Sequence, residues 1–133
     1  MKEIKVNGIV LARHIKNEDI KEGLNFFSND SDYIQVGVWG HYEQGKILQK
    51  HIHNAFERTV NRTYEVLFVI KGGIEAKIYS LAEEYIETVI VQKGEILTLL
   101  DCGHGYKVLE SGTTVLEVKN GPYVGREKDR YRF

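Results

Sequence analysis

The chain is a succession of short stretches in which apolar and polar residues alternate, and glycines stand at the joints between them. Alternation with a period of two places successive side chains on opposite faces and predicts β-strands buried on one side. Helical periodicity is almost absent, and only one proline occurs. About eight or nine such strands predict an antiparallel sandwich or barrel. The predicted strands cover residues 4–12, 33–42, 64–70, 74–81, 85–91, 96–100, 106–109 and 113–118, with Gly8 as a possible bulge or turn in the first.

The remaining segments are expected to be turns, one short helix and a tail. Residues 17–27 are the one stretch where a short helix is predicted, with Asn17 as its N-cap. The pair Gly72-Gly73 predicts a hairpin turn. A chain of 133 residues has room for one domain with one core. Within it we expect a barrel over about residues 33–119, an N-terminal strand and short helix over 1–30, and a C-terminal tail over 120–133.

Composition and charge exclude several classes of function. The net charge is −1 and the basic residues are dispersed, whereas nucleic-acid binding needs a concentrated positive field. The single cysteine, Cys102, leaves no internal disulfide and fits a reducing cytosol; we expect a buried, inert thiol rather than a metal ligand. The N-terminal region lacks a secretory apolar segment, and no apolar run approaches the length that spans a bilayer. We therefore expect a cytoplasmic protein with neither nucleic acid nor membrane as a partner.

The histidines carry the clearest chemical signal. His51 and His53 are separated by one residue, so on a strand both side chains point to the same face. Glu65 opens the apolar strand that follows, and His104 lies on a later segment. Two imidazoles, a carboxylate and a third imidazole in one cavity would form a small open metal site. The alternative is that His51 and His53 are surface residues, and the pattern alone leaves both possibilities open.

The spacing of these residues resembles the cupin superfamily, a group of small β-barrel proteins. The first cupin motif is G-x5-H-x-H-x3,4-E-x6-G, and Gly45, His51 and His53 fit its first half. Glu57 has the expected distance from the histidines, whereas Glu65 has the expected distance before the closing glycine. We favour Glu65 as the motif carboxylate because it opens the apolar strand, while Glu57 lies in a polar loop.

The second cupin motif, G-x5-P-x-G-x2-H-x3-N, is matched more loosely. Gly94 and His104 are present, but Leu100 stands where proline is usual, the spacing is one residue short, and the closing asparagine is missing. More closely, the chain resembles small stand-alone cupin proteins associated with bacterial surface-polysaccharide and sugar-nucleotide pathways. The segments that carry this resemblance are residues 51–58, 63–72, 101–106 and 117–133.

The resemblance implies an all-β fold, an antiparallel double-stranded β-helix of the jelly-roll or cupin type, with a divalent metal ion held by His51, His53, Glu65 and His104. Mixed nitrogen and oxygen ligands leave Zn²⁺, Fe²⁺, Ni²⁺ and Mn²⁺ as candidates, and an open coordination position would polarise a carbonyl or hydroxyl group. A metal-free alternative within the superfamily is a sugar-nucleotide ketoisomerase or epimerase. There His51 or His53 would transfer a proton beside a tyrosine, with Tyr64 as the candidate. A third alternative is a non-enzymatic module that binds a small ligand.

Other side chains are candidates for contacts with a small polar ligand. Arg58 and Arg62 could clamp a phosphate or carboxylate, or simply be solvated on an exposed loop. Tyr106 and Trp39 could form part of an aromatic wall for a sugar or base, although core packing is the better explanation for each of them taken alone. His41 shares a face with Trp39, and the pattern does not decide whether that face is interior. Because the open edges of a barrel are commonly protected by pairing, we also expect a homodimer.

Overall fold

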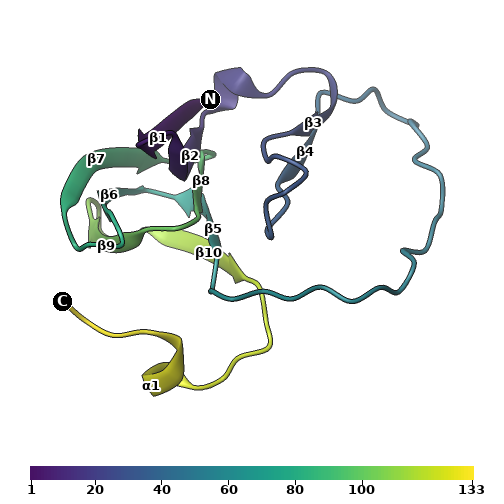
Figure 1. The fold of residues 1–133 in the computed structure, drawn as a ribbon. Helices are drawn as coiled ribbons and strands as arrows, with labels where there is room; N and C mark the ends of the chain where they lie inside the picture. The colour runs from purple at the N-terminus through teal and green to yellow at the C-terminus, as the bar shows by residue number, and fades with distance from the viewer.

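The computed structural model describes residues 1–133 as two antiparallel sheets that face each other, with a hairpin against one of them (Figure 1). The larger sheet has the strand order β1-β2-β8-β5-β10, the smaller sheet has the order β7-β6-β9, and β3 and β4 form the hairpin. The strands are β1 (Lys2–Val6), β2 (Ile9–Ile15), β3 (Gly23–Phe26), β4 (Gly37–Gly40), β5 (Glu65–Lys71), β6 (Gly73–Tyr79), β7 (Tyr85–Gln92), β8 (Ile96–Leu99), β9 (Gly103–Val108) and β10 (Thr114–Lys119). A 3₁₀ turn covers Asn17–Asp19, and one short helix, α1, covers Arg126–Asp129.

The main core lies between the two sheets and follows from the alternation in the strands. In β5, Leu67 and Val69 are buried together with Glu65, whereas Phe68 and Ile70 on the other face are exposed. The inward residues of β5 pack in one apolar cluster with those of β6, β7 and β8. Burial of such apolar side chains stabilises the fold by roughly 25 cal/mol for each Å² removed from water. The core of the sandwich therefore lies mainly between β5, β6, β7 and β8. On one side of the sandwich, β9 is the edge strand of the smaller sheet and β10 is the edge strand of the larger sheet.

The β3–β4 hairpin covers part of the outer face of the larger sheet. Phe27 and Val36 beside the hairpin form a second apolar cluster with Ile15 of β2 and Ile96 of β8. The cover does not extend to β5 and β10, where the directly opposed pair Phe68 and Leu116 is exposed. The apolar residues left exposed on this outer face of the larger sheet are Phe68, Ile70, Leu116 and Val118.

The all-β class is confirmed, while the closed cupin barrel stays a prediction. The strands predicted over 64–70, 74–81, 85–91, 96–100 and 113–118 are present as β5–β8 and β10 with small shifts at their ends. The strand predicted over 4–12 is divided into β1 and β2, because Asn7 and Gly8 adopt positive φ values and form the turn of the β1–β2 hairpin, in agreement with the possible turn at Gly8. This hairpin belongs to the larger sheet, so the N-terminal residues are part of the body and not an extension of it.

Two further predicted elements differ from the structure. The helix expected over 17–27 is reduced to the 3₁₀ turn, because residues 23–26 pair with β4 and form β3 instead. The strand expected over 33–42 is reduced to β4, and residues 45–64 contain no strand at all. The His51–His53 segment is therefore not on a β-hairpin. Neither helical segment has the length and apolar character needed to cross a membrane.

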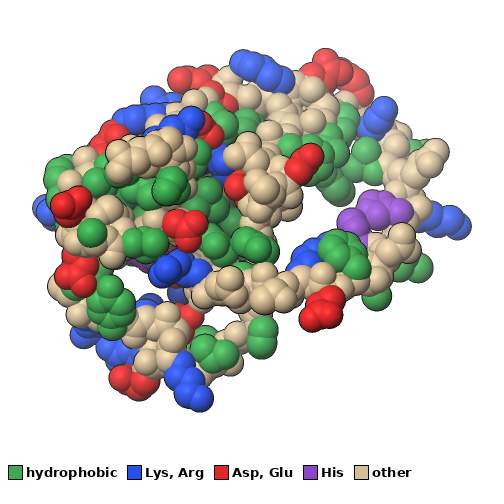
Figure 2. Space-filling view, viewed as in Figure 1, with side chains coloured by type: hydrophobic (Ala, Val, Ile, Leu, Met, Phe, Trp, Pro, Cys, Tyr) green, Lys and Arg blue, Asp and Glu red, His purple; other side chains and the backbone are tan.

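A long segment between β4 and β5 stands away from the sheets, and we call its residues 43–59 the arm. Every residue of the arm is exposed, and its one backbone hydrogen bond joins Lys46 to Glu43. Figure 1 shows this segment as a wide arc, and Figure 2 shows open space between it and the body. The arm is thus attached to the body only through its two ends.

The C-terminal tail holds residues 62–64, which connect the arm to β5. The side chain of Asn120 accepts a hydrogen bond from the Tyr64 backbone N–H at 2.6 Å and donates one to the Arg62 carbonyl at 3.2 Å. Thr63 donates a hydrogen bond to Asp129 of α1. The chain beyond β10 therefore fixes the residues that lead directly into β5.

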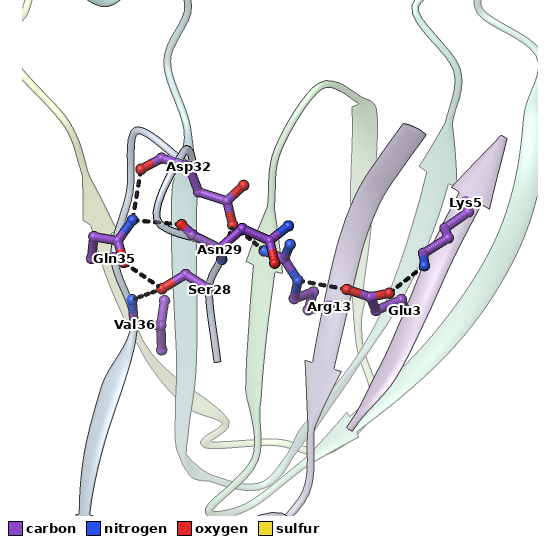
Figure 3. A network of polar contacts seen from close by, with 8 residues as sticks. All are labelled: Glu3, Lys5, Arg13, Ser28, Asn29, Asp32, Gln35 and Val36. Carbon is purple, nitrogen blue, oxygen red and sulfur yellow. Dashed lines mark hydrogen bonds and ion pairs between the residues drawn. The ribbon is translucent and has the colours of Figure 1, made fainter. Parts of the chain in front are cut away.

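A buried arginine lies where the segment between β3 and β4 crosses the larger sheet (Figure 3). The Arg13 side chain is 1% exposed, and it pairs with Asp32 at 2.5 Å and with Glu3 at 3.0 Å. Asp32 also accepts a hydrogen bond from the backbone N–H of Asn29. Figure 3 shows Arg13 between the two carboxylates, which come from β1 and from the segment after β3. The ion pairs therefore tie this segment to the N-terminal hairpin.

Replacement of Thr98 by valine is expected to stabilise the protein by about 1 kcal/mol. Thr98 of β8 is completely buried beside Arg13, and its hydroxyl group has no hydrogen-bond partner. Valine has nearly the same shape and removes the cost of burying an unpaired hydroxyl group. Urea denaturation measures the effect, with Thr114→Val on the exposed part of β10 as the control. A loss of stability in Thr98→Val would contradict the expectation.

Candidate functional site

A polar cluster interrupts the apolar interior at the start of β5. Glu65 projects inward from β5, and its side chain is 8% exposed. The carboxylate contacts three side chains from two other strands: Lys119 Nζ lies 2.8 Å from Oε1, and His104 Nε2 and the Tyr106 hydroxyl group lie 3.3 and 3.2 Å from Oε2. Lys119 is directly opposite Glu65 in the β10–β5 pairing, whereas His104 and Tyr106 reach it from β9 of the other sheet. The cluster therefore joins the two sheets across the interior.

The charges in this cluster hold Glu65 in its ionised form. Burial by itself raises the pKa of Glu65, but the hydrogen bonds with His104 and Lys119 outweigh burial and lower its pKa to about 2. Burial by itself lowers the pKa of Lys119, because it disfavours the charged ammonium form. The hydrogen bonds of Lys119 to Glu117 and Glu65 outweigh burial and raise its pKa. Near neutral pH the site therefore contains a buried carboxylate paired with an ammonium group.

The rings of His104 and Tyr106 are stacked on each other beside the Glu65 carboxylate. Both side chains point inward because they alternate with outward residues on β9, and their rings are stacked at 5.2 Å with an angle of 27°. Burial and the nearby Glu65 raise the pKa of Tyr106 strongly, so its hydroxyl group is protonated and donates to the carboxylate. The Nδ1 atom of His104 is buried and has no hydrogen-bond partner. The imidazole thus keeps one ring nitrogen without a hydrogen-bond partner.

The structure brings together two of the four predicted metal ligands. Glu65 and His104 are in contact, whereas His51 and His53 lie on the exposed arm with their rings 5.0 Å apart. Between the two candidate carboxylates, Glu65 is the buried one and Glu57 is an exposed residue of the arm. Histidine, cysteine, aspartate and glutamate side chains do not gather anywhere in groups of three or more that could hold a metal ion. The predicted four-ligand set is therefore divided between the body and the arm.

Most of the predicted ligand-contacting residues lie away from Glu65. Trp39 of β4 is exposed, and so is His41, which follows the strand with a positive φ and has its Nε2 atom 3.3 Å from the Ile20 carbonyl oxygen. Arg58 lies over the Phe56 ring within the arm, at 3.5 Å from the ring centroid, and Arg62 pairs with Asp101 at 3.3 Å. Of the predicted contacts, only Tyr106 belongs to the Glu65 cluster.

Tyr64, the candidate tyrosine for proton transfer, points to the opposite side of β5 from Glu65. It is buried against Ile34 and Leu100, and its ring is stacked on Tyr33 at 5.9 Å. Burial and the nearby Asp101 raise its pKa. Tyr64 lines a pocket of about 280 Å³ together with Tyr33, Asp32 and Asp101. Its position fits a packing role better than a role beside the histidines.

Cys102 and His14 have structural roles outside the Glu65 cluster. The Cys102 thiol is buried, and burial raises its pKa to about 12, which agrees with an inert thiol. His14 is buried in β2, and its Nε2 atom lies 2.8 Å from Glu95 Oε2. His14 is thus a hydrogen-bonded structural histidine.

Lys119 is the site residue that sequence reasoning missed. In the strand TVLEVK, alternation puts Lys119 and Glu117 on one face with Val115, whereas Leu116 and Val118 lie on the other face. The second face is the more apolar one, so the local pattern predicts an outward Lys119, opposite to what the structure shows. The partner itself depends on the β10–β5 pairing, which the local pattern does not contain.

We compared the chain with known protein families, with curated proteins and with solved structures, and none of them matches it. The functional conclusions therefore depend on the geometry of the site and on the sequence motifs.

Proposed function

We propose that this protein binds a small polar molecule at the Glu65–His104 site, with sugars and sugar nucleotides as the first class to test, and that a divalent metal ion takes part. The observation that carries the proposal is an ionised carboxylate that is almost fully buried and in contact with an imidazole from the opposite sheet. A buried charge is costly unless it is paired, so such a cluster inside an apolar core is typical of a functional site.

The residues present fit a metal ion in part. Glu65 and His104 supply an oxygen and a nitrogen donor of the types that Zn²⁺, Fe²⁺, Ni²⁺ and Mn²⁺ accept. Two donors are too few, and His51 and His53 of the arm are the residues predicted to complete the set. Lys119 now occupies one carboxylate oxygen of Glu65, so it would have to move aside or bridge to the ligand. The chemistry that a bound ion would supply is polarisation of a ligand carbonyl or hydroxyl group.

Loss of metal in defined variants tests the proposal. Elemental analysis of protein purified without an affinity tag is expected to find roughly one divalent ion per chain in the wild type. His104→Ala and the double variant His51→Ala/His53→Ala are expected to lose it, because each removes predicted ligands. His41→Ala is the matched control, since it removes an exposed histidine outside the set and is expected to retain the metal. Equally low metal in the wild type and all variants would contradict the metal part of the proposal.

A second candidate, metal-free proton transfer on a sugar nucleotide, is favoured by the contact of Tyr106 and His104 with one carboxylate. A histidine next to a tyrosine hydroxyl group and a carboxylate has the groups needed for acid–base catalysis. In this candidate the tyrosine is Tyr106, and Glu65 positions both groups. Product formation from nucleotide-activated sugars without added metal would favour this candidate, whereas thermal stabilisation without product would favour a non-enzymatic binding module.

A further inference from the structure

Two strand edges on the same side of the sandwich are open. β9 pairs only with β6 and β10 pairs only with β5, and β5 and β6 are consecutive strands of different sheets. The outer edges of β9 and β10 therefore leave backbone N–H and C=O groups without strand partners. The residues between these edges are partly exposed although they point inward: Tyr106 is 42% exposed and Val108 is 62% exposed. This side of the molecule has room for a further strand.

The arm is an exposed segment with the length and apolar content to form such a strand. Its residues Ile47, Leu48 and Ile52 are apolar and exposed, Ile47 to 82% and Ile52 to 94%. In an extended conformation, residues 47, 49, 51 and 53 would share one face, and Leu48 and Ile52 would lie on the other. Without a strand partner, these apolar side chains stay in water and the backbone groups bond only to solvent.

We propose that the arm of a second copy of this chain adds to the free edge of β9 as an antiparallel strand, so that two copies exchange their arms. The pairing that fits best sets Ile47 opposite Val108 and His51 opposite His104. It brings together two exposed apolar side chains on the inner face and sets Lys50 opposite Gly105. A shift by two residues would instead set Lys50 opposite Lys107, and like charges directly opposite one another are destabilising.

Exposed apolar residues on the outer face of the larger sheet favour the arm of a second copy, rather than the chain's own arm, as the strand beside β9. Phe68, Ile70, Leu116 and Val118 are exposed there next to the open edge of β10. An arm that closed on its own body would satisfy β9 but leave these four residues in water. Two copies related by a two-fold axis can exchange arms and also bring these faces together, as stable homodimer interfaces bury roughly 800 Å² or more on each partner.

Arm exchange depends on the proposed function in one respect only, the position of His51 next to the Glu65–His104 cluster. The test of arm exchange uses neither metal nor ligand, so its result is independent of the proposed function. Leu48→Cys and Lys107→Cys are combined in a Cys102→Ala background, because the proposed pairing sets residues 48 and 107 opposite each other on the outer face. Mild oxidation with oxidised glutathione is expected to give a covalent dimer on a non-reducing gel. The control pairs Leu48→Cys with Lys77→Cys, which lies opposite Gly105 on the next strand and so about 10 Å from the arm. That distance exceeds the reach of a disulfide, so little cross-linking is expected.

Each other outcome overturns the proposal. A monomer that migrates differently after oxidation would show that the arm closes on its own chain, and the absence of any cross-link would show that the arm does not pair with β9. Light scattering gives an independent measure, because Ile47→Asp is expected to weaken the dimer roughly tenfold or more. Ile9→Asp, an exposed isoleucine at the opposite hairpin, is the control and should leave the dimer intact. Circular dichroism of each variant verifies that it is folded.

Discussion

Asp32→Ala is expected to lower the free energy of unfolding by about 3 kcal/mol, although the residue lies in a loop and at a distance from the Glu65 cluster. The reason is its partner: Arg13 is fully buried, and Asp32 is one of the two carboxylates that compensate its charge. Removal of one carboxylate leaves a buried guanidinium group with only Glu3, which is more costly than loss of an exposed pair. The buried Nη2 atom of Arg13 already lacks a hydrogen-bond partner, so no further protein group is in place to replace the lost carboxylate.

A second substitution separates this cause from a general disturbance of the loop. Arg13→Met removes the charge and keeps an unbranched apolar side chain, so its cost is expected to be smaller than that of Asp32→Ala. The double variant Arg13→Met/Asp32→Ala is expected to be more stable than Asp32→Ala alone, because no uncompensated charge remains. Urea denaturation of the four proteins completes the cycle. Strictly additive effects would show that the two residues do not depend on each other.

The second large effect is expected in acid. Glu65 has an ordinary pKa of 4.5 when unfolded and a pKa of about 2 in the folded protein, so its pairing stabilises the fold fully above pH 4.5. As the pH falls through about 2, the folded carboxylate becomes protonated and this contribution is lost. The difference between the two pKa values corresponds to about 3 kcal/mol. Stability is thus expected to fall steeply between pH 4.5 and pH 2.

Glu65→Gln provides the comparison for the acid effect. Glutamine keeps the shape of the side chain but cannot titrate, so the variant is expected to be less stable at pH 7 and to approach the wild type near pH 2. Glu3 and Asp19 have pKa values lowered by Lys5 and by the N-terminal ammonium group, but they titrate in both proteins and cancel in the difference. Denaturant titrations at several pH values measure the difference, and parallel curves for the two proteins would contradict the prediction.

The strands that could be predicted are those in which local pattern and turn chemistry agree. β5 and β6 follow from apolar alternation on both sides of Gly72, whose φ of 73° is the conformation that glycine adopts easily. The contact of Glu65 with His104 agrees with the inward face of each strand. Here each local signal and the tertiary structure favour the same arrangement.

The parts that could not be predicted depend on long-range partners. Lys119 faces Glu65 because β10 pairs with β5 across more than fifty residues, and nothing near Lys119 specifies that register. The arm shows the same limitation in reverse. The pattern around His51 and His53 predicts a strand, but the structure has none there, because a strand forms only when an edge accepts its backbone hydrogen bonds.

The hydrogen bonds between the C-terminal tail and residues 62–64 have a practical consequence for variants altered beyond β10. Asn120, through its bonds to the backbone at Tyr64 and Arg62, holds the peptide immediately before Glu65, and Thr63 is held by Asp129. A substitution of Asn120 or Asp129 therefore releases the peptide that leads into the buried carboxylate.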